Sequence, residues 1–223
     1  MHDVGAALRR LPLQPEALMC RDTWVKACTP PRLWHPLSIP SRTAVVAANF
    51  AAAPATRVFR GIEDARAMEA FAPQTLAADV FHLRAMVAGV EAGKLSLRQV
   101  RHAIIAFSGP TQGDLTGRDL DLLWRVFQVP IFEQRLGGDG APVARECEVH
   151  DGMHVALENA EVELIDGELV LTSLTDTACP VLRVRTGYSA SVADGLCHCG
   201  RAEPRIRRLA RLEQRALAHS AAG

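Results

Sequence analysis

Four side chains in the second half of the sequence have the types and the spacing of a zinc site. Cys147 and His154 are separated by six residues, and Cys197 and Cys199 by one. Thiolates and imidazole nitrogens are ligands that zinc takes in a closed, tetrahedral structural site. Residues 161–174 lie between the two pairs and have the pattern of a β-hairpin, which would fold the chain back on itself. We therefore predict a structural zinc site formed by these four residues.

Two alternatives to this ligand set stay open. His150 or His198 could replace His154, because both lie in the same stretch. The cysteines could also be two unrelated pairs of free thiols beside a surface histidine. Six cysteines in a chain of this length are too few for a disulfide scaffold, so clustered thiols favour a metal. Three cysteines outside the cluster are expected to be small buried apolar residues: Cys20, Cys28 and Cys179.

Five phrases follow one another in a fixed order along the second half of the chain. They begin at Gln128, Ala144, Gly167, Cys179 and Cys197, and read QVPIFEQ, AREC with GMHV, GELVLTSLT, CPVLRVRTG and CHCGR. Together they resemble the phenylacetate–CoA ligase family of AMP-forming adenylating enzymes. The resemblance covers residues 98–206 and, more weakly, 70–97. It implies part of the large N-terminal domain of that family, with zinc at the four positions named above.

The phosphate-binding parts of that family are altered in this sequence. A loop rich in Ser, Thr and Gly is missing, and the segment that starts at Ser108-Gly109 resembles the adenine-pocket segment of the family in altered form. In the metal motif, Arg135, Leu136 and Gly138 stand where the family has Tyr, Gly and Ser/Thr.

Two further positions weaken the case for catalysis. Asp139 falls where the family has its magnesium-binding glutamate, and Tyr188 replaces the aspartate that would hold the ribose hydroxyls. The chain also stops near the hinge of the family, before the domain that carries the catalytic lysine. Acyl adenylation needs a phosphate cradle, magnesium and a cation at the transition state. We therefore do not expect a self-sufficient ligase, nor binding of ATP and magnesium.

Two functions follow from these observations. The first is a non-catalytic remnant of an acyl-adenylating enzyme, stabilised by zinc, which acts as an accessory or binding protein for a protein partner such as a complementary ligase subunit. The second is a residual or split AMP-forming acyl/aryl-CoA ligase component that binds an acyl adenylate or a related small molecule. The candidate pocket for the second consists of Ser108, Gly109, Phe132, Asp139 and Arg185.

The composition is that of a globular protein. The 223 residues include 25 basic and 25 acidic side chains, and 48% are hydrophobic. Balanced charge argues against attraction of the whole chain to nucleic acid or to anionic membranes. No apolar run approaches the roughly 20 residues of a membrane helix, and residues 1–11 lack the pattern of a signal peptide. We expect a cytoplasmic protein with no nucleic-acid or membrane partner.

The elements that position these residues predict an α/β fold. A strand–helix–strand order in the first half indicates a parallel βαβ layer. The second half indicates a smaller, antiparallel, β-rich zinc-binding unit, because residues 161–165 and 168–172 flank Asp166-Gly167. The apolar run 43–49 is expected to be a short buried strand or the start of a helix. Strands are expected at 56–60, 100–107, 129–133 and 181–186, and helices at 16–27, 62–71, 76–92, 115–127 and 204–218.

The expected domain organisation has four parts. Prolines make residues 1–60 an irregular N-terminal arm, which Trp24, Trp34 and Phe50 could pin to a neighbouring surface. Residues 61–135 form the α/β layer and 136–203 the metal-binding unit. Residues 204–223 are expected to be a basic C-terminal surface helix and tail, with an apolar stripe.

Overall fold

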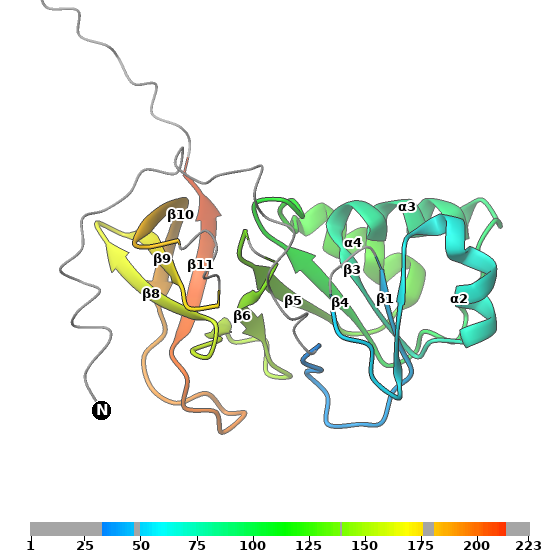
Figure 1. Cartoon of the computed structure of the whole chain (residues 1–223), viewed down its shortest axis with the longest axis horizontal. Coiled ribbons are helices and arrows are strands. Elements are labelled where there is room, and N and C mark those ends of the chain that lie inside the picture. The colour runs from blue at the N-terminus through cyan, green and yellow to red at the C-terminus, as the bar shows by residue number, and fades with distance from the viewer. Residues whose placement is uncertain (1–32, 47–49, 139, 176–180, 213–223) are drawn as a thin grey trace, which may run out of the picture.

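One mixed β-sheet of eleven strands extends through the described part of the chain (Figure 1). The computed structural model describes residues 33–46, 50–138, 140–175 and 181–212. The parallel half of the sheet lies on the right in Figure 1 and the antiparallel half on the left. The predicted α/β class is therefore confirmed, and the two halves share a single sheet.

The parallel half consists of five strands, and its three central strands are buried on both faces. They pair in the order β2-β1-β3-β4-β5. Strands were predicted close to β2, β4 and β5, the run at β1 was predicted as a strand or a helix start, and β3 was not predicted. The bounds are β1 (Thr43–Val46), β2 (Thr56–Phe59), β3 (Thr75–Asp79), β4 (Ala103–Ser108) and β5 (Ile131–Leu136).

Three helices cover one face of the parallel strands (Figure 1). Met68, Leu83, Met86 and Leu123 from these helices pack against the buried side chain of Ile104 and its neighbours on that face. A 3-10 turn (Ile62–Asp64) precedes α2 (Ala65–Phe71), and the other two helices are α3 (Val80–Glu91) and α4 (Gly117–Phe127).

The opposite face of the parallel strands is covered by the segment that the sequence assigns to an N-terminal arm. The rings of Phe50 and Phe107 stack with their centroids 4.8 Å apart. The side-chain amide of Gln134 donates to the backbone oxygen of Trp34 at 2.7 Å. Both contacts agree with the expectation that Trp34 and Phe50 pin this segment to the sheet, whereas Trp24 lies outside the described residues.

Polar caps fix where the two longer helices begin. Asp79 ends β3, and its carboxylate accepts a hydrogen bond from the backbone N–H of His82 at 2.8 Å. Thr116 and Asp119 form a reciprocal capping box at the start of α4. Asp119 also pairs with Arg84 of α3 at 2.6 Å, so the cap joins the two helices.

The stability of the helical layer is expected to fall in acid because of this ion pair. The Arg84 guanidinium lowers the pKa of Asp119 from 3.8 to about 2. A lowered folded-state pKa stabilises the protein above pH 3.8, and this stabilisation is lost as the pH falls towards 2. The loss is about 1–2 kcal/mol, reduced by solvent around the half-exposed Arg84.

Urea unfolding between pH 2 and pH 6 tests this ion pair. The wild type and the control Asp121→Asn should lose this stability in acid, whereas Asp119→Asn should not. Equal acid sensitivity of all three proteins would contradict the assignment.

The antiparallel half continues the same sheet in the order β5-β6-β7-β11-β10-β9-β8. Asp166 and Gly167 have φ of 54° and 78°, so the predicted Asp-Gly turn joins β8 to β9 as a tight hairpin. The bounds are β6 (Pro142–Glu146), β7 (Met153–Val155), β8 (Ala160–Ile165), β9 (Glu168–Ser173), β10 (Val184–Val192) and β11 (Arg205–Arg211).

The helix predicted at 76–92 is wrong in its first four residues. Leu76, Ala77 and Ala78 belong to β3 and are fully buried between β1 and β4. A central parallel strand is buried on both faces, so it shows no alternation that would separate it from a helix. The helix predicted at 115–127 is present as α4, in which Leu123 is buried and Trp124 is 57% exposed.

The C-terminal helix predicted at 204–218 is wrong, since residues 205–211 form β11 between β7 and β10. The pairing of β10 with β11 contains a register shift, in which Ser189–Ser191 faces the longer stretch 207–210. Such a bulge adds one residue and interrupts the alternation of a strand. Ile206 and Leu209 therefore belong to the same apolar cluster although they are three residues apart. The same spacing is typical of residues on one face of a helix, which is why a helix was predicted here.

Other expectations concern the ends of the chain. The range 1–60 was expected to be irregular, yet β1 and β2 fall within it. The helix predicted at 16–27, the tail beyond residue 212 and the three isolated cysteines lie outside the described residues. Among the described helices, none is long and apolar enough to cross a membrane.

Candidate metal centre

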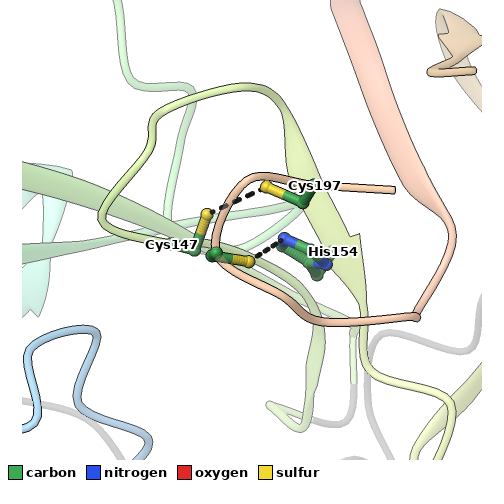
Figure 2. A group of neighbouring side chains, drawn as sticks. Cys147, His154 and Cys197 are labelled. Carbon is green, nitrogen blue, oxygen red and sulfur yellow. Dashed lines mark hydrogen bonds between the residues drawn. The ribbon is translucent and has the colours of Figure 1, made fainter. Parts of the chain in front are cut away.

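The structure brings together the four side chains that the sequence predicts as zinc ligands. Cys147 follows β6, His154 lies on β7, and Cys197 and Cys199 lie on the loop between β10 and β11 (Figure 2). Their ligand atoms all lie within 4.8 Å of one another. The Sγ atoms of Cys147 and Cys197 are 3.7 Å apart, and Sγ of Cys199 is 3.4 Å from Nε2 of His154.

Two tight turns and the strand pairing explain why these residues meet. The backbone N–H of His150 donates to the carbonyl of Cys147 at 3.1 Å, and that of Gly200 donates to the carbonyl of Cys197 at 2.9 Å. Each turn thus directs its cysteine inward. His154 pairs with Arg205 in the β7–β11 ladder, which brings the second turn against the first.

A glycine allows the close approach of these two strands. Gly152 has a φ of 82°, and a Cβ atom there would lie 2.7 Å from the backbone oxygen of Ile206. A side chain at this position would therefore push β11 away from the metal-ligand turn.

The distances fit a tetrahedral zinc ion. Zn–S bonds of about 2.3 Å and Zn–N bonds of about 2.0–2.1 Å at tetrahedral angles place two sulfurs about 3.8 Å apart, and a sulfur and a nitrogen about 3.5 Å apart. The observed 3.7 and 3.4 Å agree with these values. Cys147, His154 and Cys197 are buried, and Cys199 is partly exposed. Four protein ligands leave no open coordination position, so such a site would be structural rather than catalytic.

Burial favours the neutral forms of Cys147 and His154 when no cation is bound. Burial raises the pKa of Cys147 to about 11, and burial lowers the pKa of His154. A buried thiol with a raised pKa stays protonated at neutral pH unless a positive charge compensates the thiolate. A divalent ion that takes soft ligands supplies that charge and takes up the lone pair of the neutral imidazole.

The two histidines left open as alternative ligands lie outside this group. The ring of His150 stacks on Phe132 with centroids 4.7 Å apart, and its Nδ1 lies 3.7 Å from the Glu146 carboxylate. His198 is exposed on the loop between the two cysteines. His154 is therefore the histidine whose ring nitrogen faces the thiols.

Arginines surround the metal-ligand turns. Arg205 has a side chain that is 2% exposed, pairs with Asp151 and donates to the backbone oxygens of Asp194 and Gly195 at 3.3 and 3.1 Å. Arg201 pairs with Glu148 at 3.0 Å. The Arg205 contacts join the loop that carries Cys197 and Cys199 to the turn between β6 and β7.

The residues predicted for a nucleotide or acyl pocket do not form one group. Ser108, at the end of β4, is buried and donates to the Glu133 carboxylate. Gly109 has a φ of 151° and packs against the backbone of Leu136, which leaves no room for a side chain. Phe132 points to the opposite face of β5 from Glu133, because successive side chains of a strand alternate.

Arg185 lies in the antiparallel half of the sheet and is paired with acids of the hairpin. Its guanidinium contacts the Glu168 carboxylate at 2.5 Å and lies 3.8 Å from Asp166. Arg183 pairs with Glu163 at 2.8 Å, as expected for alternating arginines on a strand. Asp139 lies outside the described residues.

A polar contact network that sequence reasoning missed lies at the junction of the two halves of the sheet. The Arg135 guanidinium lies 3.9 Å from the ring centroid of Tyr188, whose hydroxyl donates to Asp114 at 2.6 Å. Asp114 also lies 3.6 Å from Arg135. The only signal in the sequence was that Arg135 and Tyr188 depart from the pattern of the family that they resemble.

Two half-buried acids, Glu133 and Glu146, adjoin this network. Burial raises the pKa of Glu133 and of Glu146. The Glu146 carboxylate accepts a hydrogen bond from the backbone N–H of Glu133 at 2.8 Å, and Glu133 accepts from Ser108. Both carboxylates thus take part in local hydrogen bonds that join β4, β5 and β6.

Comparison with solved structures shows which fold this is. The chain resembles 2-hydroxyisobutyryl-CoA ligase in an open conformation with 2-HIB-AMP and CoA, at a TM-score of 0.59 and 16% identity, over 75% of this chain and 44% of that chain. The same ligase in its thioesterification state matches at a TM-score of 0.59 and 16% identity, over 78% and 44%. No protein-family model and no curated protein matches the sequence.

The fold is therefore that of part of an adenylate-forming acyl-CoA ligase. The chain spans less than half the length of these ligases. At 16% identity the likeness concerns the fold alone, and activity, substrate and partner do not follow from it.

Proposed function

We propose that this protein is a zinc-stabilised, non-catalytic relative of the phenylacetate–CoA ligase-like enzymes that acts in the cytoplasm as an accessory or binding protein. The observation that carries the proposal is the buried group of three cysteines and one histidine, whose ligand atoms lie within 4.8 Å of one another. A closed site of this kind stabilises a fold and supplies no chemistry.

The carboxyl edge of the parallel strands supports the non-catalytic part of the proposal. Open α/β sheets bind ligands at that edge. Here the edge beyond β4 and β5 holds Arg135, whose guanidinium contacts Tyr188 and lies 3.6 Å from Asp114. These side chains pair with one another, and the Ser108 hydroxyl donates to Glu133, so neither Arg135 nor Ser108 is directed towards a phosphate group.

A protein partner, such as a complementary ligase subunit, is part of this proposal. The chain matches 44% of the length of the solved ligases.

Calorimetry with magnesium and ATP tests the absence of catalysis. The wild-type protein is expected to show no saturable heat, because Arg185 is paired with Glu168 and Arg135 with Asp114. Saturable binding that is lost in Arg185→Ala, and kept in the exposed-arginine control Arg118→Ala, would contradict the proposal.

A second candidate function is a split AMP-forming ligase component. The observation in its favour is that both solved neighbours hold 2-HIB-AMP and CoA on the fold that this chain shares in part. Under this alternative, Ser108, Gly109, Phe132 and Arg185 would bind an acyl adenylate only when a second chain completes the site. Acyl-adenylate binding by a co-purifying complex, but not by the isolated protein, would favour it.

A further inference from the structure

The imidazole of His154 has one ring nitrogen that the four-ligand cluster does not explain. Its Nε2 faces Cys199 at 3.4 Å, while its Nδ1 is buried and has no hydrogen-bond partner within the described residues. A neutral histidine that binds a metal through one nitrogen carries its proton on the other. That N–H group needs an acceptor, because an unpaired buried donor is unfavourable.

Glu203 is placed to accept this proton. Its carboxylate Oε2 lies 3.9 Å from Nδ1 of His154, slightly beyond hydrogen-bond range. The backbone beside it is fixed, because Val155 N–H donates to the carbonyl of Pro204 at 2.8 Å and Arg205 pairs with His154 across the ladder. The Glu203 side chain is 31% exposed, which leaves it room to rotate towards the imidazole.

Two other acids near the metal-ligand turns are paired with arginines. Glu148 pairs with Arg201 at 3.0 Å, and Asp151 pairs with Arg205. Within the part of the chain that the structure describes, Glu203 forms no ion pair with an arginine. Its carboxylate is therefore available to the imidazole.

We propose that Glu203 is a positioning residue for the metal centre, whose carboxylate accepts the Nδ1–H of His154 and so presents the Nε2 lone pair to zinc. This role rests on the proposed zinc site. The bond fixes both the tautomer and the orientation of the ring, and it increases the basicity of the ligand. Glu203 itself does not bind the metal.

A competing acceptor is the main-chain carbonyl of Glu203, which belongs to the same residue and lies next to the imidazole. Substitution of the side chain separates the two, because Glu203→Ala and Glu203→Gln keep the carbonyl and remove the carboxylate. A suitable control is Glu158→Ala, since Glu158 pairs with Arg145 at 2.9 Å on the surface of the same unit.

The experiment measures zinc affinity by competition with a chromophoric chelator. Glu203→Ala is expected to bind zinc about 10–100-fold more weakly than the wild type, Glu203→Gln to lie between the two, and Glu158→Ala to match the wild type. Equal affinity of Glu203→Ala and wild type would assign the acceptor role to the carbonyl and overturn the proposal.

Nitrogen-15 NMR of the histidine ring gives a readout that a merely structural role would not change. In the zinc-loaded wild type, His154 should show metal bound at Nε2 and a slowly exchanging Nδ1 proton, and this proton should exchange quickly in Glu203→Ala. A proton that stays protected in the variant would contradict the role of Glu203. A wild-type protein that binds no zinc would instead overturn the metal centre, so the two failures are distinguishable.

Discussion

The double substitution of Cys147 and Cys199 by serine is expected to cause a large loss of stability of the folded protein. The two thiols belong to different turns, so their removal would release zinc and separate the loop 193–204 from β6 and β7. A ligand at a thousandfold excess over its Kd stabilises the folded state by about 4 kcal/mol. The loss corresponds to a decrease in Tm of about 8–16 °C for a domain of this size.

Differential scanning calorimetry of zinc-loaded protein checks this prediction. The matched control is His198→Ala, which changes an exposed side chain on the same loop and should melt like the wild type. A chelator should lower the Tm of the wild type to that of the double variant. Identical melting of the wild type and Cys147→Ser/Cys199→Ser would show that no metal holds these turns together.

The second large effect is expected from Asp151→Ala. Asp151 pairs with the buried Arg205 and with Arg207, and the variant would leave the Arg205 charge without its counter-ion. Removal of one partner leaves the other charge uncompensated, so the variant should unfold at a clearly lower urea concentration than the wild type. Because Arg205 also binds the carbonyls of Asp194 and Gly195, the metal-ligand loop should loosen as well.

Urea unfolding with two comparison variants tests this effect. Glu91→Ala removes the exposed ion pair with Arg125 and should cost about 0.5 kcal/mol or less. The double variant Asp151→Ala/Arg205→Met should recover part of the loss, because the unpaired buried charge is gone. If Asp151→Ala were as stable as Glu91→Ala, Arg205 would not depend on Asp151.

The sequence was sufficient to predict which four residues meet, because their types are conspicuous and their spacing suits two turns. Cys147 and Cys199 lie 3.4–3.7 Å from their neighbours Cys197 and His154, as the predicted ligand set requires. The hairpin was equally predictable, since Asp166-Gly167 specifies a tight turn by local conformation alone. Both predictions depend on local chemistry rather than on long-range packing.

What the sequence could not predict depends on partners far away in the chain. The apolar pattern of β11 resembles that of a helix because a bulge opposite Ser189–Ser191 places Ile206 and Leu209 on one face. The start of β3 imitates a helix because burial on both faces removes its alternation. The Arg135–Tyr188 contact joins residues of β5 and β10, and no periodicity within either strand points to it.

Metal content is the measurement that tests the central claim most directly. Elemental analysis should use protein purified without added zinc and without a histidine tag, together with thiol titration under native conditions. We predict about one zinc ion per chain, with Cys147, Cys197 and Cys199 protected until the metal is chelated. Protein without zinc, in which these three thiols react freely, would contradict the account of a zinc-stabilised protein.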